Sequence, residues 1–545
     1  DLALDKSPLE VDVDGIILEI GHMGKYQIKH FLWTFIPVLF SALHASNYIF
    51  TTPDVVYRCK ISECDGPGTT HNYDTPWLSN AIPEDDKCNR YVSKDPSWNS
   101  TTECPANLFD KNKQTSCDEY VFREEDTFLE EVNIPCESWK RTLIGTMHSV
   151  GTLFALPIIG AFSDKFGRRH ALVVSSMLEG ILGIVKSLSV NYGMFAAMEL
   201  LEATFGSGTY TSAYILALEI LTPSTRVAAS ALIIIYFATG QVCMGAIAWA
   251  IPYWRTYLQV IYPPSLLMFT FYWISDDSIR WMITKLKFQE ALDVITKIAK
   301  DNKKTLPEKA LEGLRYNIEN KEKFLVNTVD EEGKEQKPVS PFKLVLRSKI
   351  LILRVLKASV WWVTCTFCFY GLSINSTTVL KGNMYVNFML SAAVEIPAHV
   401  ISYFGLTYFG RKKTIFTAFL IGGICLVSFP FIPEDLYWLA LIAYLIGKGC
   451  VAMAFGAVYL YTSELFPTPL RHSLLAMCSM IGRIGSILAP QTPLLAEYYA
   501  PLPSFLFAGA CLISAALMLT SPETLNKKLP ETIEEAENIS KKTPK

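Results

Sequence analysis

The sequence predicts an all-α membrane protein with twelve transmembrane helices in two six-helix halves and a disulfide-rich loop after the first helix. Three observations predict this fold. Half of the 545 residues are hydrophobic and only 19% are charged, whereas soluble proteins carry about 25% charged residues. The apolar residues gather in runs long enough to cross a bilayer, and two charged motifs recur at nearly one offset. The net charge of −3 gives no indication of nucleic-acid binding.

Twelve apolar runs can each cross about 30 Å of hydrocarbon as a helix. They fall at 31–51, 141–163, 170–190, 193–218, 227–250 and 253–274, and then at 351–374, 383–406, 414–433, 436–462, 472–493 and 502–521. The resulting segments are an N-terminal segment (1–30), helix 1 (31–51), a long loop (52–139), helices 2–6 (140–274), a polar linker (275–350), helices 7–12 (351–521) and a tail (522–545). Because residues 1–27 are polar and acidic, we expect the first run to be both insertion signal and first span.

Basic residues in two short loops set the expected orientation. They lie between spans 2 and 3 and between spans 8 and 9: Lys165, Arg168, Arg169, Arg411, Lys412 and Lys413. By the positive-inside rule, both loops and both termini are cytoplasmic. The loop 52–139 then faces outward and is acidic, with 18 Asp or Glu against 8 Lys or Arg, whereas the linker 275–350 holds 13 against 16. We therefore expect a multi-pass plasma-membrane protein.

The outward loop also carries the signs of an exterior domain. It holds six of the 13 cysteines: Cys59, Cys64, Cys88, Cys104, Cys117 and Cys136. An even number in an exterior loop predicts three disulfide bonds, although six cysteines allow about fifteen pairings and the sequence does not choose among them. The sequon Asn99-Ser100-Thr101 predicts glycosylation at Asn99. The other seven cysteines fall within spans, where packing is their expected role.

An internal repeat divides the spans into two equivalent halves. Glu219 and Arg226 lie seven residues apart at the end of span 4, and Glu464 and Arg471 do the same at the end of span 10, 245 residues later. The Gly-Arg-Arg sequence at 167–169 matches Gly-Arg-Lys at 410–412, with an offset of 243. Two unrelated motifs at nearly one offset indicate duplicated six-helix halves. This is the parallel repeat of the major facilitator architecture, in which the substrate site lies between the halves near the midplane.

The motifs themselves resemble a known family. The pattern Gly160-x-x-x-Asp164-x-x-Gly167-Arg168-Arg169 resembles the loop signature of the major facilitators. The chain resembles more specifically the organic cation/anion/zwitterion transporters of solute carrier family 22, which carry a large cysteine-rich loop after span 1. Further marks are YGLSIN at 370–375, EIPA at 395–398, the tail at 522–535, and the stretch from Gly447-Lys448 to YTSELFPT at 461–468, which is most similar to the carnitine-transporter branch. One departure is SDDSIRW at 275–281, where the family usually carries Pro-Glu-Ser-Pro-Arg-Trp, and it puts a cytoplasmic gate contact in doubt.

Charged residues at the cytoplasmic helix ends are candidate gating residues. An ionisable side chain in a span costs about 2.5–3.5 kcal/mol or more, so each must be paired, hydrated or functional. The resemblance implies ion-pair latches that close the inner side in the outward-open state, and the alternative is solvated end charges. The residues are Asp164, Arg168, Arg169, Glu219, Arg226, Arg411, Glu464 and Arg471.

Arg483 is the strongest candidate for substrate recognition. It lies about halfway along span 11 among small residues, and a guanidinium suits bidentate recognition of a carboxylate. In the resembling family this position is acidic in the cation carriers and Arg in the anion and carnitine carriers, which favours a substrate with an anionic group. The alternative is a permanent pair with an acid such as Glu395. Glu395 in span 8 either pairs with Lys448 in span 10 or binds a substrate ammonium, a proton or a sodium ion.

Aromatic and polar residues complete the predicted cavity. The resemblance implies six lining residues: Tyr210, Tyr214, Phe237, Trp362, Tyr370 and Phe455. Aromatic faces attract ammonium groups by about 0.5–2 kcal/mol. In span 1, His44 and Asn47 are candidates to face the cavity, and His44 alternatively is a neutral, hydrogen-bonded core residue. The spans also contain four charged residues without an assigned role: Glu179, Lys186, Glu199 and Glu202.

These features together predict a plasma-membrane transporter that moves small zwitterionic or anionic organic solutes, carnitine-like or amino-acid-like, by alternating access. An organic cation transporter of the same family is the main alternative. A sugar porter is less favoured because span 7 lacks the paired Gln residues of that branch, and a membrane receptor because of the two repeats with midplane charges. We find no nucleophile–base constellation, metal cluster or phosphate loop, so no enzyme activity, metal or cofactor is predicted. The expected partners are an organic ion, the lipid bilayer and a coupling ion, either sodium or proton, with the chain as a monomer.

Overall fold

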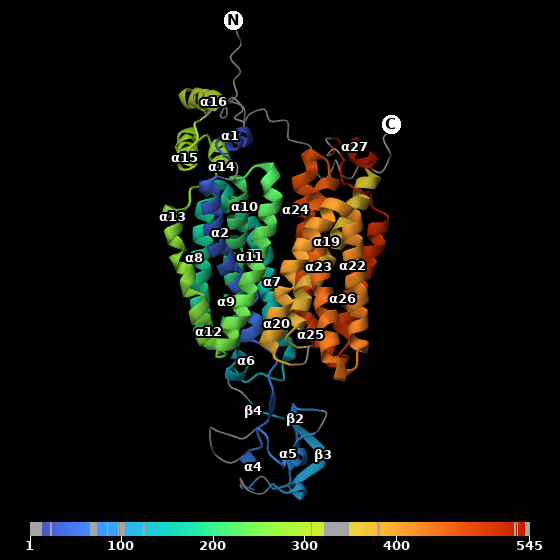
Figure 1. The fold of residues 1–545 in the computed structure, drawn as a ribbon. Coiled ribbons are helices and arrows are strands. Elements are labelled where there is room, and N and C mark those ends of the chain that lie inside the picture. Colours follow the sequence, from blue (N-terminus) through green and yellow to red (C-terminus); the bar gives the residue numbers. More distant parts are fainter. Residues whose placement is uncertain are drawn as a thin grey trace.

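The computed structural model describes residues 13–21, 24–65, 73–83, 86–95, 97–98, 104–123, 126–306, 308–320, 348–378, 382–527, 530 and 532–539. A bundle of long helices stands between a small domain at one end and a group of short helices at the other (Figure 1). We call the first end the loop end. The opposite end carries α1 (Val13–Glu19) and α27 (Ile533–Asn538), and we call it the terminal end.

Each half contributes six spans to the bundle. The first half consists of α2 (Lys25–His44) with α3 (Tyr48–Thr51), α7 (Ser138–Phe166), α8 (Arg168–Ser187), α9 (Tyr192–Gly206) with α10 (Gly208–Glu219), α11 (Pro223–Ala250), and α12 (Trp254–Ile261) with η2 (Pro263–Thr270) and α13 (Phe271–Ile274). The second half consists of α19 (Lys349–Asn375), α20 (Met384–Ala393) with α21 (Glu395–Phe404) and η3 (Gly405–Phe409), α22 (Arg411–Ser428) with η4 (Phe429–Phe431), η5 (Glu434–Leu436) with α23 (Tyr437–Leu465), α24 (Thr468–Leu488) with η6 (Ala489–Gln491) and α25 (Thr492–Tyr498), and α26 (Leu502–Leu519).

Ten of the spans in the described residues are continuous and apolar enough to cross a membrane by length and composition alone. The fourth and sixth spans are the other two. The fourth is divided between α9 and α10 at Ser207 and carries Glu199, Glu202 and Glu219. The sixth contains a 3₁₀ segment that begins at Pro263, because two consecutive prolines remove backbone donors from the helix. The predicted twelve-span, two-half fold is therefore confirmed.

The small domain at the loop end is built on two antiparallel strand pairs. β1 (Tyr57–Cys59) pairs with β4 (Tyr120–Phe122), and β2 (Asn89–Ser93) pairs with β3 (Phe109–Ser116) with a shift in register between Tyr91 and Val92. The short helices are α4 (Ser62–Asp65), α5 (Leu78–Ala81), η1 (Ala106–Leu108) and α6 (Phe128–Glu131). Three disulfides join Cys59 to Cys117, Cys64 to Cys104, and Cys88 to Cys136. The predicted three disulfides are confirmed, and they stabilise a domain too small to bury a large core. The predicted glycosylation residue, Asn99, lies outside the described residues.

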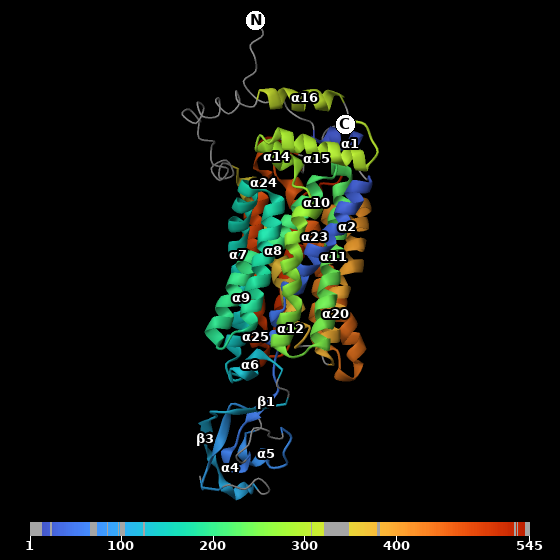
Figure 2. The same cartoon turned by 90° about the vertical axis from the view of Figure 1, so that its left-hand side faces the viewer.

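Part of the linker folds into helices at the terminal end. α14 (Ile279–Thr284), α15 (Phe288–Asp301) and α16 (Glu308–Glu319) lie across this end of the bundle (Figure 2). Apolar residues of these helices pack with Ile17 and Ile20 of the α1 segment in one core, which includes Trp281 and Ile295.

The two halves share a helix cap that extends the repeat. Gly167 and Gly410, which precede α8 and α22, have positive φ values of 106° and 97°. At the first, Asp277 accepts hydrogen bonds from the backbone N–H groups of Arg168 and Arg169 at 2.9 and 3.2 Å. At the second, Glu523 accepts from those of Arg411 and Lys412 at 2.9 and 3.1 Å. The two acids are 246 residues apart, close to the offsets of the sequence motifs. The segment 275–281 departs from the family pattern, and its Asp277 makes the same helix-cap contact that Glu523 makes in the second half.

Candidate functional site

Arg483 lies on α24 with its side chain half-buried and its backbone within the helix. In the part of the chain that the structure describes, its guanidinium has neither a hydrogen-bond acceptor nor an ion-pair partner. The neighbouring Gly482 and Gly485 serve helix packing: a Cβ on Gly485 would lie 2.4 Å from the carbonyl oxygen of Val363 on α19. The glycines thus bring α24 against α19, and Arg483 directly follows Gly482 in the same helix.

Two groups of aromatic side chains lie near Arg483, one from each half. In the second half, the ring of Trp362 is 4.7 Å from that of Tyr459 and 6.1 Å from that of Phe455. Tyr459 is 51% exposed and within electrostatic range of Arg483. Sequence reasoning missed Tyr459, because its only signal is its position one helical turn after Phe455 on α23.

In the first half, the ring of Tyr210 is 6.1 Å from that of Tyr214 and 5.4 Å from that of Phe237. The hydroxyl of Tyr210 is within electrostatic range of Tyr459 and of Tyr370, which belong to the second half. Aromatic residues of the two halves therefore lie close enough to interact, and Tyr459 also interacts electrostatically with Arg483.

Glu395 and Lys448 form a buried ion pair of 3.0 Å within the second half. The ammonium of Lys448 also donates to the carbonyl oxygen of Phe369 at 2.9 Å and to Ser373 Oγ at 2.7 Å, and it lies 3.6 Å from the centre of the Phe369 ring. Of the alternatives left by the sequence, the pair with Lys448 is the one this structure contains, and Arg483 is not paired with Glu395. In this conformation the carboxylate of Glu395 is therefore not free for a substrate ammonium.

A second buried network occupies the first half, and it contains the four charged residues that had no assigned role. Lys186 is fully buried, and its ammonium lies 2.9 Å from Glu199 and 3.4 Å from Glu202. It also donates to Asn47 Oδ1 at 3.1 Å and to the Tyr262 hydroxyl at 2.9 Å. Four spans meet here, which no single-helix pattern in the sequence reveals.

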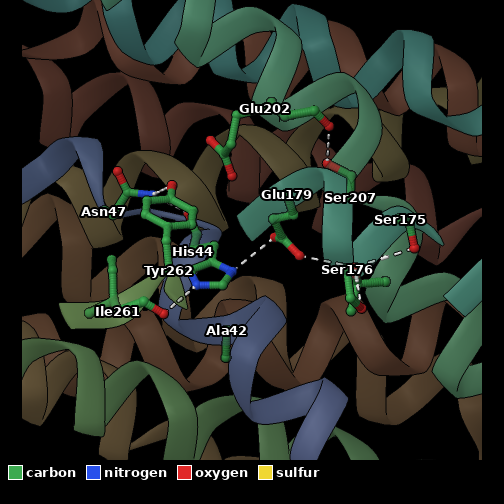
Figure 3. Close-up of polar contacts among 12 residues, drawn as sticks. Ala42, His44, Asn47, Ser175, Ser176, Glu179, Glu202, Ser207, Ile261 and Tyr262 are labelled. Atoms are coloured by element: carbon green, nitrogen blue, oxygen red, sulfur yellow. Dashed lines mark hydrogen bonds and ion pairs between the residues drawn. The ribbon is translucent and has the colours of Figure 1, made fainter. Parts of the chain in front are cut away.

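His44 and Asn47, the two candidates in span 1, both belong to this buried network (Figure 3). His44 lies between the carboxylate of Glu179, 3.1 Å from Nδ1, and the carbonyl oxygen of Ile261, 3.0 Å from Nε2. The structure places both residues inside the first half, away from the aromatic groups, which agrees with the core alternative for His44.

One part of the network has the composition of a metal site. His148, Glu199 and Glu202 offer ligand atoms within 4.8 Å of one another. However, the Lys186 ammonium already lies between the two carboxylates, and His148 Nδ1 is 2.9 Å from Glu199 Oε1. An ion here would have to displace an ammonium that balances the same charge.

The predicted gating residues lie at the terminal end, and their contacts stay within one half. Arg168 contacts Asp164 at 2.9 Å and Glu219 at 3.5 Å. Arg411 pairs with Glu464 at 3.0 Å. The remaining three contact partners in their own halves: Arg226 with Asp14, Arg169 with the carbonyl oxygens of Tyr272 and Ser275, and Arg471 with Thr468.

Among the described residues, the polar contacts that join the halves lie at the loop end, where Arg141 of α7 is 3.7 Å from Glu497 of α25. Gln491 accepts a hydrogen bond from Thr142 at 3.1 Å and donates one to Thr146 at 2.6 Å. Gly145 lies between these threonines, and a Cβ there would come within 2.7 Å of Tyr48 and 2.8 Å of Pro490. The two halves are thus tightly apposed at the loop end, and we call this contact between α7 and η6 the loop-end seal.

Comparison with known proteins decides the family. A family model described as "Sugar (and other) transporter" matches residues 67–536. The chain belongs to this family. It is 32% identical to the organic cation transporter protein of Drosophila melanogaster, over 97% of this chain and 95% of that protein. It is 29% identical to organic cation/carnitine transporter 2 of Homo sapiens (96% and 94% covered) and 29% identical to organic anion transporter 3 of Sus scrofa (96% and 93%).

These relatives confirm the resemblance to solute carrier family 22, and with it the expectation of a multi-pass membrane transporter that is not an enzyme. The fold has solved counterparts in the xylose transporter XylE from E. coli. A partially occluded inward-open form of XylE has a TM-score of 0.59 at 12% identity, with 91% of this chain and 99% of that chain covered. A second form, bound to 6-bromo-6-deoxy-D-glucose, has a TM-score of 0.56 at 15% identity, with 95% and 99% covered. At these identities the likeness concerns the fold alone.

Proposed function

We propose that this organic ion transporter carries small solutes with a carboxylate, and that ammonium carboxylates of the carnitine or amino-acid kind fit best. The observation that carries the proposal is the guanidinium of Arg483, which has no hydrogen-bond or ion-pair partner among the described residues. A charge held within a span without a partner is costly, and a substrate carboxylate would supply two parallel acceptors for the guanidinium fork. Binding would then exchange an unsatisfied cation for a charge-assisted pair.

The aromatic groups supply the complementary half of a zwitterion site. Of these aromatic residues Tyr459 is exposed, and its ring can attract a quaternary or primary ammonium by about 0.5–2 kcal/mol, with the buried Trp362 packed against it at 4.7 Å. Because Lys448 holds Glu395, the rings are better placed than that carboxylate to receive the ammonium. Relatives named as carnitine and anion transporters fit this reading.

A cation carrier is the second candidate, since the Drosophila relative is named an organic cation transporter and aromatic faces alone bind ammonium ions. Arg483 opposes it, because a cation in the same cavity would meet an uncompensated positive charge. The two candidates therefore make opposite predictions for variants of this residue.

The test is uptake by cells that express the chain, with radiolabelled carnitine and with its analogue in which a neutral amide replaces the carboxylate. Breaking a charged hydrogen-bonded contact costs about 2–5 kcal/mol, so R483A should weaken carnitine binding by about 30-fold or more. R483K should recover only part, because it keeps the charge without the fork. The amide should lose less affinity than the acid in R483A, with surface biotinylation reporting the amount of protein. Equal losses for acid and amide would show that Arg483 holds the fold, and improved uptake of a simple tetraalkylammonium by R483A would favour the cation carrier.

We further propose that the loop end faces the cell exterior and that both termini are cytoplasmic at the plasma membrane. The three disulfides of the loop-end domain would persist in an oxidising exterior, and basic loops at the terminal end fit the positive-inside rule. With the loop-end seal formed, this conformation would be closed to the outside. The gating pairs, which here stay within each half, would exchange partners across the halves when the terminal end closes.

A further inference from the structure

The His44–Glu179 pair cannot be formed by a neutral histidine and an ionised glutamate. A carbonyl oxygen only accepts hydrogen bonds, so His44 Nε2, 3.0 Å from the carbonyl of Ile261, must carry a hydrogen. In a neutral ring Nδ1 is then a bare acceptor, and it faces a carboxylate oxygen of Glu179 at 3.1 Å. Two acceptors do not approach this closely, so one additional proton must lie on Nδ1 or on Glu179.

The remaining contacts of Glu179 orient its carboxyl group. Its second oxygen accepts from Thr209 Oγ1 at 3.0 Å, and Thr209 in turn accepts from Ser176 Oγ at 3.1 Å. Figure 3 shows His44 and Ser176 on opposite sides of the Glu179 carboxyl group, with Tyr262 stacked on the His44 ring at 4.3 Å. The pair is almost wholly buried, with side-chain exposures of 1% and 4%.

The surrounding charges make this proton important for the whole network. Glu202 of α9 acts electrostatically on the pair and Tyr262 after α12 stacks on His44, while Lys186 of α8, Glu199 of α9 and His148 of α7 complete the network beside them. Three carboxylates stand against one ammonium, so the network carries a net charge of −2 when both histidines are neutral and −1 when the pair holds its proton. A buried excess of negative charge favours proton uptake.

The network adjoins the loop-end seal. His148, which contacts Glu199, lies one helical turn from Gly145 on α7, and its ring is 5.3 Å from that of Tyr48. Tyr48 is one of the two residues pressed against Gly145, and the other is Pro490 of the second half. The helix α7 thus carries the network on one side and the hydrogen bonds to Gln491 on another.

We propose that the His44–Glu179 pair is a proton-binding site whose occupation stabilises the closed loop end, so that transport is coupled to protons. The pair takes up one proton from water at the loop end as that end closes, and it releases the proton to water at the terminal end before the seal reopens. This inference rests on the proposed alternating access of the transporter but not on which solute is carried. Because coupling is reciprocal, acidification must favour the closed loop end as much as closure favours the proton.

The first experiment measures closure without any substrate. Trp139 at the start of α7 and Tyr498 at the end of α25 are exposed residues of the two halves at the loop end, 54% and 88% accessible. Spin labels at these positions, in the purified full chain in nanodiscs, report the distance between the halves by pulsed electron resonance. We expect the short-distance population to grow as the pH is lowered. E179Q should remove this pH dependence, because a glutamine keeps the size and the hydrogen bonds but needs no proton to face His44.

H44Q is the second variant, and it should remove the pH dependence as well. H30Q is the matched control, since it deletes a buried imidazole from the same helix about 21 Å away and should retain the response. A wild-type distance distribution that does not change with pH would overturn the proposal, and so would an equal change in wild type and E179Q.

Uptake of radiolabelled carnitine into proteoliposomes then tests the coupling itself. An imposed proton gradient should drive accumulation in wild type, a sodium gradient at equal pH should not, and E179Q should only equilibrate the solute. Failure to carry carnitine at all would count against the proposed substrate, while the distance measurement would still decide the proton site. Sodium-driven accumulation that is unchanged in E179Q would overturn proton coupling.

Discussion

Removal of the Lys186 ammonium tests how the first half tolerates its buried acids. Lys186→Met keeps the length of the side chain and deletes the charge that serves Glu199 at 2.9 Å and Glu202 at 3.4 Å. Breaking a buried ion pair by removing one partner costs about 3–5 kcal/mol, because the other charge stays buried and uncompensated. Two carboxylates lose their partner here, so we expect a loss near the upper value, about 5 kcal/mol. That is a large part of a typical total stability of about 5–15 kcal/mol, and little of the variant should reach the surface.

The double variant K186M/E202Q should recover most of this loss. It restores the wild-type net charge of the network, and Glu199 keeps its contact with His148. The second half offers the matched comparison, because Lys448 serves a single carboxylate, Glu395. K448M should therefore cost less than K186M, about 3 kcal/mol, and K448M/E395Q should again recover part of it.

The assay is the apparent melting temperature of detergent-purified protein, followed by size-exclusion chromatography after heating, with surface biotinylation as a second measure. All variants are heated at one rate, because membrane proteins of this size unfold irreversibly. If K186M has the same apparent melting temperature as the wild type, or if K186M/E202Q is no more stable than K186M, Lys186 does not compensate the two carboxylates. The charges assigned to the network are then wrong.

Two further predictions concern the ends of the bundle. D277N should lower the apparent melting temperature, because it weakens two hydrogen bonds to the start of α8, each worth about 1.5–3 kcal/mol when the acceptor is charged, and E523Q should have a similar effect at α22. An effect of only one of these two substitutions would contradict the equivalence of the two helix caps. Non-reducing peptide mapping should recover the three loop-end disulfides as paired in the structure, and glycosidase should shift the mobility of wild type but not of N99Q. Any other pairing, or equal mobility of treated and untreated wild type, would contradict these predictions.

The sequence predicts the architecture well because hydropathy and duplication are properties of single helices and of the whole chain. The twelve runs, the two offsets and the six exterior cysteines each needed no knowledge of which helices pack together. The breaks at Ser207 and Pro263 escaped prediction, since the apolar runs continue through them. The pairing of the disulfides depends on the strand pairs β1–β4 and β2–β3, which the sequence does not reveal.

The candidate site was predictable only where a residue stands out on its own helix. Arg483 does so, as a lone guanidinium in mid-span. The network around Lys186 does not, because its members come from span 1, α7, α8, α9 and the residue after α12, and only their packing gives them a shared role. The helix cap made by Asp277 was not predicted, because its segment departs from the family pattern. Asp277 and Glu523 are nevertheless 246 residues apart, close to the offsets of the repeat.

The modest size of the loop-end seal bears on how fast this protein can work. Beside the ion pair of 3.7 Å between Arg141 of α7 and Glu497 of α25, the two halves are joined here by two hydrogen bonds of one glutamine, Gln491, and each such bond contributes about 0.5–1.5 kcal/mol net. The loss of both hydrogen bonds therefore changes the ratio of closed to open molecules by about 5- to 150-fold. One neutral side chain thus supplies a measurable part of the difference between the two resting populations. Substitutions at position 491 are therefore expected to change the populations of the open and closed states, and with them the turnover rate, without altering the cavity.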